Sequence, residues 1–340
     1  MKIKPFIIAE LSGNHNQSLE RALKIIEAAA ACGVDALKIQ TYTPDSMTLN
    51  LVNQKGFYIE DKHSLWAGKT CYEIYQVAAT PYSWHKPIFD KCKEQGIIGF
   101  STPFDLEGVN FLESLNVQIY KIASAEIVDI PLLKRVAQTN KPVIMSTGMA
   151  NLMEIKEAVE TLKNNGCSDL SILKCTSSYP ANVEDSNLLT IIDLQKHFPD
   201  CKVGLSDHTL GIGASIASVA LGACVIEKHF TLSRADGGVD SAFSMEPAEM
   251  KQLVEECQNA FKALGKVSYD LSESEKKSTN FRRSIYVVQN IKKGEIFTNE
   301  NIKSIRPSYG LHTRYYEKIL GKISKKDLSI GTPLKLEYLE

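Results

Sequence analysis

The sequence lacks the short motifs that would assign it to several common enzyme classes. No C-x-x-C pair occurs among its 340 residues, which excludes a zinc knuckle and a thioredoxin-type redox motif. No G-x-G-x-x-G loop follows a predicted strand, and Gly68-Lys69-Thr70 lacks the upstream glycine of a Walker loop because residue 63 is His. H-E-x-x-H and G-x-S-x-G are also missing. Dehydrogenase, kinase and serine-hydrolase functions therefore lose their usual support.

The chain also lacks an excess of charge and any long apolar run. Its net charge is -1, so no basic field favours nucleic acid or an acidic membrane surface. No apolar run approaches the roughly 20 residues that span a bilayer, and no cleavable leader is evident after Met1. The eight cysteines are scattered singly, which is typical of buried free thiols in a reducing compartment. We expect a cytoplasmic protein whose partners are small molecules or another copy of the chain.

Eight short apolar runs, most of them followed by an amphipathic helical pattern, recur along the first three quarters of the chain. Such runs suit strands that are covered on both faces, as in parallel sheets. The number of runs predicts a (β/α)8 TIM barrel rather than an open doubly wound sheet, although strand order cannot be read from one sequence. The predicted strands are Phe6–Ala9, Ala36–Ile39, Ile97–Phe100, Gln118–Ile122, Val143–Met145, Leu170–Leu173, Val203–Leu205 and Cys224–Ile226.

Helix boundaries are visible between these runs. Ser18 can cap a helix over Leu19–Cys32 that Gly33 stops, and Pro131 can open one over Leu132–Gln138. Asn151 with Glu154 makes a plausible capped start to the next helix.

The pattern also predicts the division into domains. Residues 1–267 form the expected barrel, the polar stretch 268–280 is the expected linker, and residues 281–340 form a small second domain. About 60 residues hold only a marginal core, so this domain is expected to rest on a barrel, its own or a neighbour's. The connection over 41–80 exceeds ordinary loop lengths and starts at the functional end of strand 2, which favours a segment that covers the substrate.

Chemistry in a TIM barrel collects at the carboxyl ends of the strands. Polar residues follow all eight apolar runs, and lysines and histidines are concentrated there. A scaffold that needed only stability would have no reason for that placement. The strand-end residues are Glu10, Lys38, Gln40, Thr102, Lys121, Ser124, Glu126, Ser146, Lys174, Ser177, Tyr179, Ser206, His208 and His229.

Two of these residues predict a metal site. His208 and His229 close strands 7 and 8, and adjacent strands lie about 4.8 Å apart. Their imidazoles can therefore converge on one cation, with water and a carboxylate completing the set, as suits Mn, Co or Zn.

Two lysines predict an anion site. Lys38 and Lys121 would bring two cations into one cavity, which is costly unless an anion is expected. The hydroxyls of Thr102, Ser124, Ser146 and Ser206 complete a cradle for a compact dianion or trianion such as phosphoenolpyruvate. The alternative is a closed salt-bridge network in which Glu10 and Glu126 neutralise the lysines.

At this point the residues resemble a known family. The C-terminal part, from Arg282 through Gly294 to Arg306-Pro307, is similar to an antifreeze-like (SAF) domain. The barrel part resembles the sialic acid synthase family in seven stretches: Ile8-Ala9-Glu10, Lys38-Ile39-Gln40-Thr41, Ser101-Thr102-Pro103-Phe104, Tyr120-Lys121-Ile122-Ala123-Ser124, Ser146-Thr147-Gly148-Met149, Gly204-Leu205-Ser206-Asp207-His208 and Glu227-Lys228-His229-Phe230.

The resemblance implies a phosphoenolpyruvate-dependent synthase that needs a divalent metal at His208 and His229, Mn first and Mg or Co next. It implies phosphoenolpyruvate contacts at the two lysines and four hydroxyls named above, with Lys38 and Lys121 stabilising developing charge. Glu126 would orient the sugar or assist proton transfer, and Glu10 would act near the phosphoenolpyruvate or the metal. The implied sugar contacts are Gln40, Glu126, Tyr179, Asp240 and Arg306, the last from a second subunit in a homodimer with exchanged C-terminal domains.

Within the family the chain is most similar to the pseudaminic acid synthase branch, which makes a precursor of cell-surface glycans from a 6-deoxy di-N-acetylated altrose. This resemblance is carried by Gln40-Thr41-Tyr42-Thr43-Pro44-Asp45-Ser46, Cys175-Thr176-Ser177-Ser178-Tyr179-Pro180 and Arg306-Pro307-Ser308-Tyr309-Gly310-Leu311-His312. Ser177 and Ser308-Tyr309-Gly310 depart from N-acetylneuraminate synthases. The alternatives are an N-acetylneuraminate or legionaminate synthase, a Schiff-base pyruvate aldolase using Lys174, and a sugar-binding protein without enzymatic activity.

Overall fold

The chain forms two compact units, Met1–Gly265 and Lys266–Glu340. The structure is a computed structural model that describes residues 3–52, 54–60 and 66–340. Within those residues, no helix is long and apolar enough to cross a membrane.

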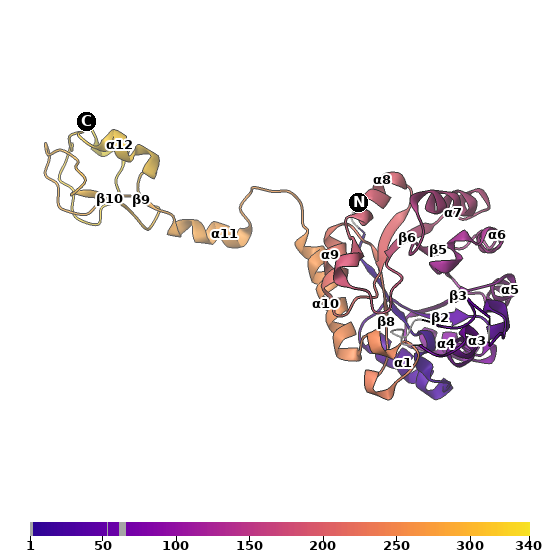
Figure 1. The fold of residues 1–340 in the computed structure, drawn as a ribbon. Helices are drawn as coiled ribbons and strands as arrows, with labels where there is room; N and C mark the ends of the chain where they lie inside the picture. Colours follow the sequence, from indigo (N-terminus) through magenta and orange to yellow (C-terminus); the bar gives the residue numbers. More distant parts are fainter. Residues whose placement is uncertain (1–2, 53, 61–65) are drawn as a thin grey trace. The chain divides into compact units, whose positions relative to one another are not determined.

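The first unit is a closed barrel in which eight parallel strands pair in sequence order (Figure 1). β1 pairs with both β2 and β8, and the second pairing closes the barrel. The predicted fold class is therefore confirmed. The strands are β1 (Phe6–Glu10), β2 (Ala36–Thr41), β3 (Ile98–Pro103), β4 (Tyr120–Ile122), β5 (Val143–Ser146), β6 (Leu170–Cys175), β7 (Lys202–Ser206) and β8 (Val225–His229).

Helices surround the barrel (Figure 1). Ser18 caps the first of them by accepting a hydrogen bond from the Arg21 N–H, and Asn151 and Glu154 form a capping box, both as predicted. The helices of this unit are α1 (Leu19–Ala31), α2 (Pro44–Met47), α3 (Cys71–Ala78), α4 (Tyr82–Glu94), α5 (Leu106–Ser114), α6 (Ile130–Ala137), α7 (Leu152–Asn164), α8 (Thr190–His197), α9 (Gly213–Ala220) and α10 (Pro247–Ala263).

The start of one helix and the ends of most barrel strands differ from the predicted positions. α6 begins at Ile130, because Asp129 accepts a hydrogen bond from the Leu132 N–H and Pro131 occupies an interior position of the first turn. Most barrel strands also continue past the apolar run, as β8 does to His229. The reason is that a polar side chain at the end of a strand does not interrupt the backbone ladder to its neighbours.

The barrel interior is apolar at one end and charged at the other. Ile8, Phe100, Ile144 and Leu173 belong to a buried cluster inside the barrel. Side chains two positions further along a strand point to the same face, which places Glu10 beyond Ile8 within the barrel. The site is therefore built on the last inward-facing layer of the strands.

The cysteines are all free, and six of the eight are buried. This agrees with the expectation of unpaired thiols inside the fold.

The second unit has its own core. β9 (Ser284–Val287) and β10 (Ile302–Ile305) pair antiparallel. A short helix, α11 (Glu273–Ser278), forms within the predicted linker, because Ser272 and Glu275 make a capping box that the sequence interpretation missed. α12 (Tyr316–Ile319) follows, and the buried core residues include Ile285, Val287, Ile291, Phe297, Ile302, Ile319, Leu328 and Leu334.

Candidate active site

A cavity of about 410 Å³ opens at the carboxyl ends of the barrel strands. Its walls include most of the predicted site residues, which come from seven of the eight strands or the loops that follow them. Those that line it are Glu10, Lys38, Gln40, Lys121, Ser124, Glu126, Ser146, Tyr179, Ser206, His208, His229 and Asp240.

Three residues considered from the sequence lie elsewhere. Thr102 is behind the wall and accepts a hydrogen bond of 3.3 Å from the Lys38 ammonium. Arg306 belongs to the second unit. Lys174 donates to the Cys175 carbonyl at 2.9 Å and to Thr176 at 3.2 Å and does not line the cavity, so the geometry does not favour a Schiff base there.

The cavity also contains residues to which the sequence analysis gave no role, above all Ser12, Cys175 and Glu227. A signal existed for Glu227, because it lies two positions before His229 on one strand and must share its face. Ser12 follows a strand end and carries no comparable signal.

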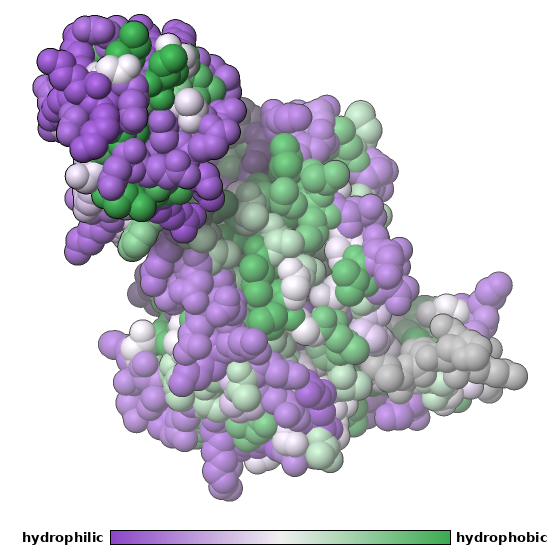
Figure 2. Space-filling model, turned by 90° about the vertical axis from the view of Figure 1, so that its left-hand side faces the viewer, coloured by the Kyte–Doolittle hydropathy of each residue, from purple (hydrophilic) through white to green (hydrophobic). Residues whose placement is uncertain are grey.

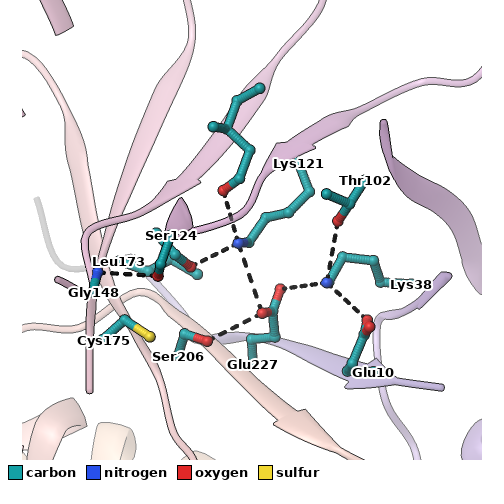
Figure 3. A network of polar contacts seen from close by, with 12 residues as sticks. Glu10, Lys38, Thr102, Lys121, Ser124, Gly148, Leu173, Cys175, Ser206 and Glu227 are labelled. Carbon is teal, nitrogen blue, oxygen red and sulfur yellow. Dashed lines mark hydrogen bonds and ion pairs between the residues drawn. The ribbon is translucent and has the colours of Figure 1, made fainter. Parts of the chain in front are cut away.

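Two buried lysines and two buried glutamates form a network across the cavity floor (Figure 3). The Lys38 ammonium lies 2.8 Å from a Glu10 carboxylate oxygen and 3.8 Å from one of Glu227. The other Glu227 oxygen lies 3.8 Å from the Lys121 ammonium and accepts a 3.1 Å hydrogen bond from Ser206. Glu227 therefore bridges the two cations.

The surroundings set the charge of this network. Burial lowers the pKa of Lys38, but Glu10 and Glu227 outweigh it, so the pKa is raised and the lysine stays a cation. Burial raises the pKa of Glu227, but Lys121 and Lys38 together bring it below its usual value. The pKa of Glu10 is raised, chiefly by burial, so Glu10 takes up a proton more readily than an ordinary glutamate.

Lys121 donates to the Ser146 hydroxyl at 2.6 Å and to the Ile122 carbonyl at 3.0 Å. Its pKa is lowered, mainly by burial. Near it, the Gly148 N–H donates to the Ser124 hydroxyl at 3.0 Å. A Cβ at residue 148 would collide with the hydroxyls of Ser124 and Ser177, so glycine is needed for this close approach.

Glu126 stands outside the lysine network, which corrects the salt-bridge alternative that paired it with a lysine. Its Oε2 atom is buried and has no hydrogen-bond partner among the described residues. Burial raises the pKa of this carboxyl group to about 7. A group with that pKa in a cavity can give or accept a proton near neutral pH.

The two predicted histidines face each other, with ring centroids 5.3 Å apart. His208 Nδ1 lies 2.9 Å from the Thr176 carbonyl, which holds a proton on Nδ1 and leaves Nε2 as the free donor atom. His229 Nδ1 is buried and lacks a hydrogen-bond partner within the described part of the chain. Burial holds the pKa of His229 well below its usual value, so its imidazole is neutral.

These features fit a divalent cation. Neutral imidazole is the form that binds metal, and a carbonyl partner on the other ring nitrogen is the usual orienting contact. No group of three or more His, Cys, Asp or Glu side chains among the described residues is placed to hold a metal. His208 and His229 would thus supply two ligands and leave further positions to substrate and water.

The 41–80 segment contributes an apolar wall. Tyr42, Ile59, Trp66 and Ile74 line the cavity. The Trp66 indole N–H donates to the Val239 carbonyl at 3.1 Å, which joins the segment to the loop after β8. The predicted covering role of this segment therefore has a structural basis in its described residues.

The profile of the NeuB family matches residues 25–269 of this sequence, nearly the whole barrel unit. The chain belongs to the NeuB family. A second profile, that of the SAF domain, matches residues 282–340. Both resemblances noted in the sequence are confirmed.

Similar proteins cover the chain almost end to end. A pseudaminic acid synthase of Campylobacter jejuni subsp. jejuni (strain 81-176) is 48% identical over 98% of this chain and 96% of its own length. One from Helicobacter pylori is 42% identical over 99% of this chain and 98% of its own. An N,N'-diacetyllegionaminic acid synthase of Campylobacter jejuni is 40% identical over 95% of this chain and 97% of its own.

Solved structures give the same picture of the fold. The N-acetylneuraminic acid synthetase of Leptospira borgpetersenii, in complex with citrate, aligns with a TM-score of 0.70 at 33% identity over 81% of this chain and 90% of its own. A truncated 3-deoxy-D-arabino-heptulosonate 7-phosphate synthase of Thermotoga maritima has a TM-score of 0.59 at 15% identity over 77% of this chain and 88% of its own. The second likeness concerns the fold alone.

Proposed function

We propose that this NeuB-family protein is a pseudaminic acid synthase. It condenses phosphoenolpyruvate with 2,4-diacetamido-2,4,6-trideoxy-L-altrose and water, and it releases pseudaminic acid and phosphate. The observation that carries the proposal is a buried pair of lysines beside a pair of facing imidazoles in one cavity. The names of the similar Campylobacter and Helicobacter proteins support the choice of product, which would enter cell-surface glycans.

Phosphoenolpyruvate binds at the cavity floor. Lys38 and Lys121 neutralise its phosphate and carboxylate, and the hydroxyls of Ser124 and Ser146 donate to its oxygens. Ser206 acts through Glu227, to which it donates a hydrogen bond. Thr102 acts from behind, because it already accepts a hydrogen bond from Lys38.

His208 and His229 would hold a divalent metal, with Mn²⁺ the first choice and Mg²⁺ or Co²⁺ the alternatives. When bound there, the metal supplies Lewis acidity that polarises the aldehyde oxygen of the open-chain sugar. The carbonyl of Thr176 orients one imidazole for this task, and burial keeps the other neutral.

The sugar occupies the outer part of the cavity, where Gln40, Glu126, Tyr179 and Asp240 surround it. Arg306 of a second subunit reaches its acyl group, which makes the active form a homodimer with exchanged C-terminal domains. Exposed apolar side chains before α11 support contact with a second subunit. Val267 is 92% exposed and Tyr269 is 98% exposed. Green apolar areas also interrupt the purple surface in Figure 2.

The reaction joins C3 of phosphoenolpyruvate to the aldehyde carbon. Water then adds at C2, and the C–O bond to phosphate breaks, so the phosphate group leaves with the bridging oxygen. Glu126, with a pKa of about 7, orients the sugar and moves a proton to or from it. Glu10 and Glu227 keep the lysines in place while charge shifts from phosphoenolpyruvate to free phosphate.

The direct experiment follows phosphate release from phosphoenolpyruvate with Mn²⁺ and a panel of 2-acetamido and 2,4-diacetamido sugars. We expect turnover with the diacetamido altrose and, with phosphoenolpyruvate labelled by ¹⁸O at the bridging position, label in the released phosphate. Turnover of N-acetylmannosamine or of the legionaminate precursor instead would contradict the product and leave the chemistry intact.

Metal removal separates the proposal from its rivals. Stripping with EDTA should abolish turnover, and Mn²⁺ should restore it. Turnover that survives EDTA, together with borohydride trapping of pyruvate on Lys174, would establish an aldolase instead. Sugar binding without any phosphate release would identify a binding protein.

A further inference from the structure

Ser12 stands at an unusual place in the backbone. It opens the 3-10 turn Ser12–His15, separated by one residue from the end of β1, and its φ is 49°, in the left-handed region that favours glycine. The side chain is buried and lines the cavity. A serine at this φ carries backbone strain that glycine would avoid, and such strain is often found at functional sites.

The hydroxyl of Ser12 connects two cavity residues that come from distant parts of the chain. It donates to Oδ2 of Asp240, 228 residues away, and accepts a 3.1 Å hydrogen bond from Nε2 of Gln40. The same Gln40 nitrogen donates to Glu10 at 2.9 Å. Both amide hydrogens of Gln40 are therefore committed to protein acceptors.

These hydrogen bonds determine which atoms of the cavity wall formed by Gln40 and Asp240 remain free to bind a ligand. With its NH2 group engaged, Gln40 has only Oε1 left, and that atom accepts no hydrogen bond from the residues that the structure describes. Asp240 accepts the Ser12 hydrogen bond, and burial raises the pKa of its carboxyl group, so Gln40 is the residue of this wall whose free atom is fixed as an acceptor. Turning the Gln40 amide over would place its oxygen against Glu10 and lose the bond to Ser12.

We propose that Ser12 is a positioning residue that holds the Gln40 amide so that its oxygen, and not its NH2 group, is free for the ligand. The wall then selects amino-sugar aldehydes that present an N–H or O–H donor to Gln40. This inference rests on the proposed function and adds the reason for the preference for an acylated amino sugar. Without the Ser12 hydroxyl, the Gln40 amide can rotate, and the preference for sugars that donate a hydrogen bond weakens.

The test uses full-length Ser12→Gly, because glycine adopts this φ freely while the hydroxyl is removed. Ser12→Ala is the second variant, in case added chain freedom affects folding. We expect the KM for the diacetamido sugar to rise about tenfold in both, with the KM for phosphoenolpyruvate within about twofold of wild type. An analogue with an ester oxygen in place of one acetamido N–H should be discriminated against by wild type and much less by Ser12→Gly.

Two further variants identify the path of the effect. Gln40→Leu combined with Ser12→Gly should cost no more than Gln40→Leu alone, because both changes remove one arrangement. Asn116→Gly is the matched control: its φ is 52°, it follows α5 at the opposite end of the barrel, and the KM for the sugar should not change.

The inference is overturned if Ser12→Gly leaves the sugar KM unchanged or raises both KM values equally. A wild-type protein that is inactive with every amino sugar overturns the proposed function and this inference together. Wild-type turnover with an unaffected Ser12→Gly variant overturns the inference alone.

Discussion

At the scale of single residues, Glu227 holds the cavity floor together. Its two carboxylate oxygens lie 3.8 Å from the ammonium groups of Lys38 and Lys121, and no other carboxylate among the described residues bridges both (Figure 3). Glu10 pairs with Lys38, so the role specific to Glu227 is to link that lysine to Lys121.

We predict that Glu227→Gln keeps the shape of the side chain and loses this function. Breaking a buried charge pair should lower the free energy of unfolding by roughly 3–5 kcal/mol, measured by urea denaturation. Misplaced lysines should lower kcat/KM for phosphoenolpyruvate roughly 100-fold. Glu154→Gln, on the exposed start of α7, is the control. Wild-type kinetics in Glu227→Gln would show that the bridge is dispensable.

Glu126 predicts a specific pH dependence. Its folded-state pKa is about 7 against an ordinary value of 4.5, so the folded protein holds this proton more tightly than the unfolded chain. Relative to Glu126→Gln, wild type should therefore lose stability as pH rises from 4.5 to 7. The total loss is about 3 kcal/mol, since one pKa unit is worth about 1.4 kcal/mol. Urea denaturation at pH 5 and pH 8 measures it, and parallel curves for the two proteins would contradict the raised pKa.

At the scale of secondary structure, a second buried ion pair joins Lys228 of β8 to Asp207, the residue that follows β7. Lys228 donates to Asp207 at 3.0 Å and to the Thr209 carbonyl at 2.7 Å, and both side chains of the ion pair are almost fully buried. Each partner lies next to a histidine in sequence, so the pair ties together the two strand ends that carry His208 and His229.

We predict that Lys228→Met destabilises the fold by roughly 3–5 kcal/mol, because it leaves the Asp207 carboxylate buried without its cation. The double variant Asp207→Leu/Lys228→Met should recover part of that loss. Affinity for Mn²⁺, measured by calorimetry, should fall roughly 10- to 100-fold in Lys228→Met, as expected for a group that orients ligands. Unchanged Mn²⁺ affinity would limit the pair to a role in stability.

The segment that covers the cavity offers an optical test. The sequence has two tryptophans: Trp66 lines the cavity, and Trp84 packs against His15 with ring centroids 5.5 Å apart. In a Trp84→Phe background, binding of phosphoenolpyruvate or sugar should shift the emission of Trp66, because a ligand replaces water beside its ring. Trp66→Phe should abolish the change. A signal that persists without Trp66 would place the movement elsewhere.

At the scale of the whole molecule, we predict from the proposed domain exchange that each active site combines residues of two subunits. A mixture of two inactive variants tests this prediction. Arg306→Ala and Lys121→Ala homodimers should each be nearly inactive. Mixing them after unfolding and refolding should restore about a quarter of wild-type activity, because half the dimers are mixed and each has one intact site. Without exchange, every site keeps one defect and mixing restores nothing.

The sequence by itself determined the barrel and the polar residues at the carboxyl ends of its strands. Eight short apolar runs with intervening helical patterns predicted all eight strands, because strands buried on both faces need apolar side chains throughout. Strand adjacency alone predicted that His208 and His229 would face each other, since consecutive parallel strands are neighbours in a closed barrel. Family stretches supplied the sugar contacts and the substrates.

Only the tertiary structure decided how the site residues share their hydrogen bonds and charges. The bridge by Glu227, the contact from Ser12 to Asp240 and the placement of Lys174 outside the cavity were not predicted. A side chain's face depends on where its strand begins in the ladder, and boundaries are the least reliable part of a sequence pattern. A contact across 228 residues depends on loop conformations that have no period in the sequence, so only the folded chain brings such groups together.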